Sequence, residues 1–156
     1  MSATAVTIET GVRRRVVAAG IAGNVLEWYD FAVYGYFAPI IAERFFPSDS
    51  PTASLLAAYG AFAAGFLMRP LGGFLFGHLG DRIGRRKTLI LSVALMAGPT
   101  FLIGVMPDAG DIGVAAAGLM ILMRMLQGLA VGGEYTTSVV YLVEQAPPNQ
   151  RGYYGS

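Results

Sequence analysis

The sequence predicts an all-α membrane protein with four transmembrane helices. Of its 156 residues, 54% are hydrophobic and 13% are charged, whereas a soluble domain carries about 25% charged residues. The apolar residues gather in four long runs, each near or above the roughly 20 residues that span about 30 Å of hydrocarbon. These runs cover approximately residues 16–42, 53–76, 88–106 and 113–143. The third run contains no charged residue, so it lacks the polar face of a soluble helix.

The first run is predicted to be a retained membrane helix that follows a cytoplasmic tail, residues 1–15. Three consecutive arginines (13–15) stand before it, as they would before a signal peptide. The run 16–42 is longer than the apolar core of a signal peptide, which has about 7–15 residues. It also contains two acids, Glu27 and Asp30, that a signal peptide would lack.

The distribution of Lys and Arg predicts the orientation in the membrane. Three basic residues precede the first run, four lie between the second and third, and Arg151 follows the fourth. The connections on the other side carry one basic residue, Arg44, among four acids. Cytoplasmic loops of membrane proteins carry the excess of positive charge. We therefore expect a multi-pass protein of the cell inner membrane with both ends in the cytoplasm.

The residue inventory argues against an enzyme. The chain has no cysteine and one histidine, which excludes thiol catalysis and leaves little room for metal chemistry. No Ser/His/Asp grouping stands out. We expect no cofactor and no metal, and a net charge of +1 gives no sign of a nucleic-acid partner. The expected partner is the lipid bilayer.

Five ionisable residues lie inside the apolar runs. They are Glu27, Asp30, Arg69, Arg124 and Glu134. Each costs roughly 2.5–3.5 kcal/mol near the centre of a membrane helix on insertion scales. Three acids against two bases predict pairing between helices, either as structural ion pairs that set the register of the helices or as a functional site.

Helical periodicity groups these charges with other polar residues. Asn24, Glu27, Asp30 and Tyr34 fall within about one third of the circumference of the first helix, near the depth at which transporters place their sites. On the fourth helix, Arg124 and Gln127 share a face, because they are three residues apart. Small residues four apart, which let helix backbones approach closely, occur on the second and fourth helices. They are Gly73 and Gly77, and Gly128 and Gly132.

Three strings resemble motifs of the major facilitator superfamily. Gly77-x-x-Gly80-Asp81-Arg82-x-Gly84-Arg85-Arg86-Lys87 resembles the loop between helices two and three, and lies where that loop is predicted. The string that begins at Arg124-x-x-Gln127-Gly128 and continues to Glu134 is similar to the helix-four motif. Glu144 and Arg151 resemble the acidic–basic pair that closes helix four.

The strings 23–35, 69–73 and 132–134 narrow the resemblance to the metabolite:proton symporter branch. That branch implies symport of an organic acid or a zwitterionic solute with protons, by alternating access. The superfamily has twelve helices in two halves. On that plan, residues 16–152 form the first part of the N-terminal six-helix half, and 153–156 begin a fifth helix. We expect a fragment or truncated product that needs the missing helices for function.

The resemblance implies a role for each polar residue. Asp30 and Arg124 would form the proton-coupling pair, with Glu27 as the alternative proton carrier. The substrate cavity, which could take a carboxylate, would be lined by Asn24, Tyr34, Arg69, Gln127 and Glu134. A cytoplasmic gate would be formed by Gly77, Asp81, Arg82, Gly84, Arg85, Arg86, Glu144 and Arg151. The alternatives are a facilitator or an antiporter on the same fold, or a non-transporting four-helix membrane subunit.

Overall fold

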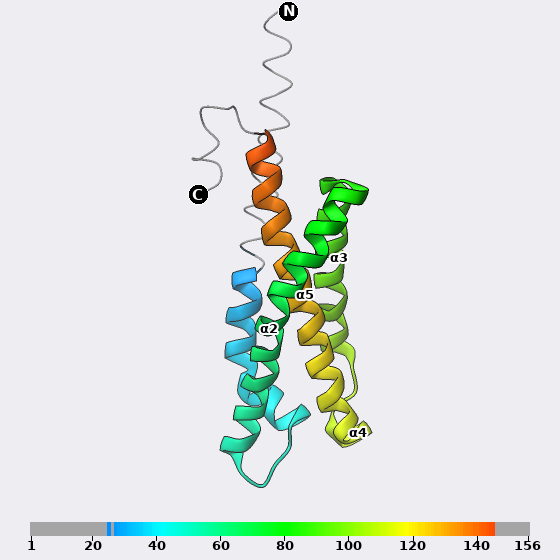
Figure 1. Ribbon diagram of the computed structural model, residues 1–156. Helices are drawn as coiled ribbons and strands as arrows, with labels where there is room; N and C mark the ends of the chain where they lie inside the picture. The colour runs from blue at the N-terminus through cyan, green and yellow to red at the C-terminus, as the bar shows by residue number, and fades with distance from the viewer. Residues whose placement is uncertain (1–24, 26, 146–156) are drawn as a thin grey trace, which may run out of the picture.

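The computed structural model describes residue 25 and residues 27–145, with backbone alone for 135–145. Every regular element in this part of the chain is a helix (Figure 1). A first helix is described over residues 27–45. It is followed by α2 (Pro51–Ile83), α3 (Arg85–Val105), the short α4 (Ala109–Ile112) and α5 (Val114–Gln145). The prediction of an all-α protein is confirmed. The predicted tail 1–15, Asn24, Arg151 and residues 153–156 lie outside the described residues.

Local sequence signals explain where α2 begins and ends. The Ser50 hydroxyl accepts a hydrogen bond from the backbone N–H of Ala53, and Pro51 occupies the first turn, where its missing N–H costs nothing. Gly84 ends the helix with φ +92°, a conformation that favours glycine. The helix extends beyond the apolar run 53–76 to Ile83. Its last two turns contain polar residues and are still helical.

Local sequence signals also explain α4, and the length of α5 exceeds what a membrane requires. A short turn of helix, α4, occupies the predicted connection, and the Asp108 carboxylate caps it by accepting from the backbone N–H of Gly110 at 2.9 Å. The last helix, α5, has 32 residues, so it is about 48 Å long at a rise of about 1.5 Å per residue. This exceeds the roughly 30 Å of hydrocarbon that a helix must cross.

Three described helices are long and apolar enough to span a membrane. They are Pro51–Ile83, Arg85–Val105 and the part Val114–Glu134 of α5. Many of their large apolar side chains are exposed, Leu67 and Phe74 among them. The connection 46–50 and α4 lie at one end of the bundle, whereas the junction of α2 and α3 and the C-terminal end of α5 lie at the other (Figure 1). Successive helices therefore run in opposite directions, as in a membrane protein that crosses the bilayer repeatedly.

Glycines bring α2 and α5 into backbone contact. These two helices share the most extensive packing of the described elements, and α3 packs on α5. A Cβ atom on Gly128 would overlap the backbone of Gly65, and one on Gly132 would overlap the backbone of Arg69. A Cβ on Gly65 would lie 2.8 Å from the carbonyl oxygen of Arg124. This close approach fixes the relative height of the two helices, and so determines which side chains meet.

Candidate functional site

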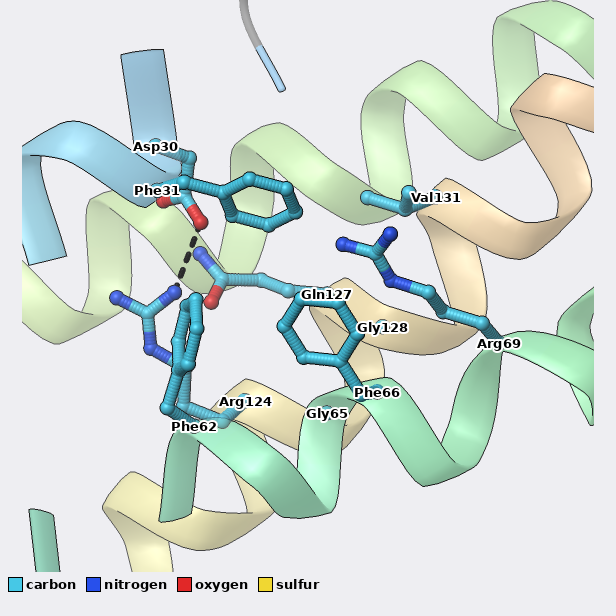
Figure 2. Close-up of a pocket in the computed structure, with 10 residues that line it drawn as sticks. All are labelled: Asp30, Phe31, Phe62, Gly65, Phe66, Arg69, Arg124, Gln127, Gly128 and Val131. Carbon is cyan, nitrogen blue, oxygen red and sulfur yellow. Dashed lines mark hydrogen bonds and ion pairs between the residues drawn. The ribbon is translucent and has the colours of Figure 1, made fainter. Parts of the chain in front are cut away.

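The most buried ion pair of the described residues joins the first helix to α5. Arg124 Nη1 donates to Asp30 Oδ2 at 2.8 Å (Figure 2). The side chain of Arg124 is 7% exposed and that of Asp30 is 17% exposed. An isolated charge at this depth would be costly, so each group makes the burial of the other possible. The two residues are 94 positions apart in the chain.

Aromatic rings complete the surroundings of Arg124. The guanidinium carbon lies 3.8 Å from the centroid of the Tyr34 ring and 5.9 Å from that of Phe62. Tyr34 is 1% exposed, and its hydroxyl donates to the carbonyl oxygen of Ala58 on α2 at 2.6 Å. The cation of Arg124 is thus held at its edge by a carboxylate and on its face by a ring.

A second ion pair joins the first helix to α2. Arg69 Nη1 lies 2.9 Å from Glu27 Oε1, and both side chains are about one quarter exposed. The guanidinium of Arg69 also lies over two rings, 4.0 Å from the centroid of Phe66 and 4.7 Å from that of Phe31. Both membrane arginines therefore have one acid from the first helix and an aromatic partner.

A short hydrogen-bond chain holds Gln127. Its Nε2 donates to Thr100 Oγ1 on α3 at 2.8 Å, and the Thr100 hydroxyl donates to the carbonyl oxygen of Met96 at 2.8 Å. Because the threonine hydrogen is used on Met96, the amide must present its nitrogen to Thr100. The amide oxygen then faces away and has no hydrogen-bond partner among the described residues.

A small pocket lies between the two arginines (Figure 2). Its volume is about 20 Å³, which is room for about one water molecule. The first helix contributes two of the lining residues, α2 contributes four and α5 contributes four. They are Asp30 and Phe31, then Phe62, Gly65, Phe66 and Arg69, then Arg124, Gln127, Gly128 and Val131. The Nε atoms of both arginines are buried without a hydrogen-bond partner among the described residues.

Some of the residues predicted to line the substrate cavity line the pocket, and others do not. Arg69 and Gln127 line the pocket, whereas Tyr34 and Glu134 do not. Tyr34 instead lies against Arg124, and Glu134 is half-buried within electrostatic range of Glu27. Sequence reasoning missed two phenylalanines of the pocket, Phe62 and Phe66, and the threonine that holds Gln127, and it favoured packing over a site role for Phe31. Phe62, Phe66 and Arg69 share one face of α2 at spacings of four and three, which was the available signal.

A third ion pair lies at the predicted cytoplasmic loop. Arg85 Nη2 lies 2.8 Å from Asp81 Oδ1 across the break at Gly84. Asp81 is 67% exposed, and the side chain of Arg85 crosses Gly80 so closely that a Cβ there would lie 3.1 Å from its Nη1. A Cβ on Gly77 would meet nothing within 4 Å. Arg82 and Arg86 are exposed.

The predicted partners of this loop from the end of the fourth helix stay untested. The side chain of Glu144 and the whole of Arg151 lie outside the described part of the chain. The structure therefore shows the acid–arginine pair within the loop, and the wider charge network remains a prediction.

Comparison with known proteins agrees with the sequence motifs. Residues 16–156 match the family model "Sugar (and other) transporter". The chain is 42% identical over 149 residues to the proline/betaine transporter of Escherichia coli K12, which covers 96% of this chain and 30% of that protein. It is 45% identical over 146 residues to the alpha-ketoglutarate permease of Escherichia coli K12, covering 92% of this chain and 34% of that protein.

The name of a third relative includes the proton as the ion that is transported with the solute. The chain is 43% identical over 156 residues to the citrate-proton symporter of Klebsiella pneumoniae, covering all of this chain and 34% of that protein. The chain thus spans about a third of the length of these curated relatives. No solved structure matches it.

Proposed function

Because the chain belongs to the sugar (and other) transporter family of the major facilitator superfamily, we propose that it forms part of a proton-coupled symporter of small metabolites. The relatives are named as transporters, permeases and a symporter, which are not enzymes. In the proposal the protein lies in the inner membrane with both ends of this chain in the cytoplasm. Residues 16–152 form the first part of the N-terminal half, and transport requires the helices that the relatives have in addition.

The single observation that carries the proposal is the buried pair of Asp30 and Arg124. A proton that binds Asp30 removes its negative charge, and the attraction between the two side chains is lost. Arg124 is then left as a buried cation without a counter-ion, which favours a conformation in which it gains a new partner. Alternating access follows if the inward- and outward-facing states differ in how well they satisfy Arg124. Glu27, paired with Arg69, is the alternative proton carrier.

The proposed substrate is an organic acid or a zwitterionic solute. Proline, betaine, alpha-ketoglutarate and citrate, which stand in the names of the relatives, all carry a carboxylate. A guanidinium presents a planar set of donors that fits a carboxylate. Arg69 and Arg124 flank the pocket between α2, α5 and the first helix. Released from its acid, either arginine offers a carboxylate two or more donors.

The proposed gate lies at the loop between α2 and α3. Asp81 and Arg85 form an exposed pair across Gly84, where α2 and α3 meet at one end of the bundle. In the proposal, this pair and the neighbouring arginines stabilise one orientation of the two halves by contacts that include Glu144 and Arg151. The gate changes the balance between states and does not contact the solute.

The test uses a chimera, in which this chain replaces the 149 matched residues of the Escherichia coli proline/betaine transporter. Uptake of labelled proline into cells is measured across pH, with and without an uncoupler. We expect uptake to depend on the proton gradient, and Asp30→Asn to abolish that dependence. Asp111→Asn serves as the control, because Asp111 is exposed in α4, which lies at the end of the bundle away from the junction of α2 and α3.

The outcomes separate the rival functions. Uptake that an uncoupler leaves unchanged indicates a facilitator, and uptake driven by the opposite proton gradient indicates an antiporter. Proton-driven uptake that survives Asp30→Asn would refute the coupling role of Asp30 and direct attention to Glu27. The chain alone, reconstituted in vesicles, should show no solute flux. A flux would contradict the requirement for further helices.

A further inference from the structure

We propose that Tyr34 is a positioning residue, which keeps the guanidinium of Arg124 at its place beside the pocket when Asp30 is neutral. The proposal rests on the proposed function, in which Asp30 gains and loses a proton. Its starting point is that Arg124 has two partners of different kinds on the same helix. Asp30 contacts it at 2.8 Å and the Tyr34 ring at 3.8 Å. Asp30 and Tyr34 are four residues apart, so they lie on one face of the first helix.

The two partners respond differently to a proton. Protonation removes the charge of Asp30 and with it the ion pair. The attraction of a cation to an aromatic face comes from the quadrupole of the ring, which protonation of Asp30 leaves unchanged. Arg124 is 6% exposed, and a cation–π contact is stronger when water is excluded. The ring therefore retains part of the stabilisation of Arg124 after the acid is neutralised.

The Tyr34 ring is itself held in place. It is 1% exposed, its hydroxyl donates to Ala58 of α2, and it stacks on Phe62 with 5.0 Å between centroids and 13° between planes. The hydroxyl is used on α2 and does not reach into the pocket. The face of the ring is what Tyr34 offers to Arg124. This explains why a residue predicted to line the cavity is buried beside it.

In the part of the chain that the structure describes, Asp30 has no second acid beside it that also forms an ion pair with Arg124. Arg69 of α2 is a second cation and pairs with Glu27. On the α3 side, Thr100 binds Gln127 and is uncharged. Among the described residues, Asp30 is the acid that forms an ion pair with Arg124. When that acid is neutral, the Tyr34 ring at 3.8 Å is the nearer of the two rings that Arg124 faces, and Phe62 lies at 5.9 Å.

The consequence is an order of events. A proton reaches Asp30 first, and Arg124 stays where it was until a new partner binds, with the donor of the former ion pair available to that partner. A solute carboxylate then finds a guanidinium already in position, which saves the cost of ordering a long side chain at the moment of binding. Without the ring, a neutral Asp30 would release Arg124 to other rotamers.

The direct test uses the chain itself in lipid nanodiscs, with nitrogen-15 and carbon-13 in its arginines. The Arg124 side-chain signals, assigned by their loss in Arg124→Lys, report the ring current of Tyr34. We expect the upfield shift to persist in Asp30→Asn and in Asp30→Asn combined with Tyr34→Phe. Asp30→Asn combined with Tyr34→Leu has no Tyr34 ring current, so there we measure the mobility of the Arg124 side chain by nitrogen-15 relaxation, and we expect it to rise above that in Asp30→Asn combined with Tyr34→Phe. Loss of the shift in Asp30→Asn alone would show that the ring does not hold Arg124, and would overturn the proposal.

Transport by the chimera gives a second readout. Tyr34→Leu should raise the KM for proline about 2- to 30-fold, the range that corresponds to a cation–π contact of about 0.5–2 kcal/mol. The maximal rate per molecule at the cell surface should stay close to that of the unmodified chimera. Tyr34→Phe should restore the KM, because it keeps the ring and loses only the hydroxyl.

A structural role gives a different result. If both substitutions lower the maximal rate equally and leave KM unchanged, Tyr34 serves the packing of the first helix on α2, and the proposal is wrong. Failure of the proposed function is seen separately. Proton-driven uptake would then survive Asp30→Asn, while the arginine signals would still report whether the ring holds Arg124.

Discussion

Two acid–arginine pairs in this molecule have the same length and different surroundings. Asp30 and Arg124 lie 2.8 Å apart, as do Asp81 and Arg85. Asp30 is 17% exposed, whereas Asp81 is 67% exposed. Water and ions screen an exposed pair, which contributes about 0–1 kcal/mol. A buried pair loses several kcal/mol when one partner is removed. The distance between two charges therefore says little about their role until their burial is known.

The two pairs also differ in what brings their residues together. The buried pair joins helices that are remote in the chain and depends on how α5 packs against its neighbours. The exposed pair joins residues four apart, and the turn at Gly84 brings them together. Changes of packing should disturb the first, and changes of the turn should disturb the second.

Removal of Arg124 should have the largest effect. Arg124→Leu leaves Asp30 buried without a counter-ion, so we expect about 3–5 kcal/mol of destabilisation and loss of proton-driven uptake by the chimera. Thermal denaturation in detergent measures the first effect. Arg124→Leu combined with Asp30→Leu should recover most of the stability and none of the coupling. If the double variant is as unstable as the single one, the unpaired acid is not the cause.

Substitution of Gly84 should come next. Its φ of +92° is strained for any residue with a Cβ, at a cost of about 1–3 kcal/mol. We expect Gly84→Ala to lower the melting temperature and to disturb the Asp81–Arg85 pair, with the Asp30–Arg124 pair intact. Gly60→Ala is the matched control, because Gly60 lies within α2, outside the predicted gate, and its Cβ would meet nothing within 4 Å. Equal losses in both variants would contradict the role assigned to the turn.

The half-buried pair should give an intermediate result. Glu27→Gln leaves Arg69 over the rings of Phe66 and Phe31, which still stabilise the cation. We expect a loss of about 1 kcal/mol, less than for a fully buried pair, and retention of proton coupling. Uptake across pH measures the second expectation. If Glu27→Gln loses proton coupling and Asp30→Asn retains it, then Glu27 is the proton carrier and Asp30 is not.

The exposed pair should give the smallest change in stability. We expect Asp81→Asn to cost less than about 1 kcal/mol, and high salt to remove the difference. Its effect should instead appear in the balance between inward- and outward-facing states, which reactivity of a cysteine placed in the cavity of the chimera reports. An unchanged balance would leave the loop pair without the proposed gating role.

Much of the fold could be predicted because its signals are local. Apolar runs mark the helices, turn residues mark the connections between them, and the acids and arginines within the runs predict pairing. The full lengths of the helices were harder to predict. Hydropathy identifies only the apolar part of a helix that contacts lipid, whereas α2 and α5 remain helical beyond that part.

The order of residues along the chain predicts the helices, the class of protein and the need of the buried charges for partners. The family resemblance implied the pair Asp30 and Arg124, whereas helical periodicity left the partners open and the packing of the helices sets them. Glu27 and Asp30 share a face, and periodicity cannot say which meets Arg69 and which meets Arg124. The choice depends on the height of α2 against α5, which glycine contacts such as that of Gly128 with Gly65 set. Helical periodicity is a property of neighbours in the chain, whereas a pair across helices depends on packing between segments that are remote in sequence.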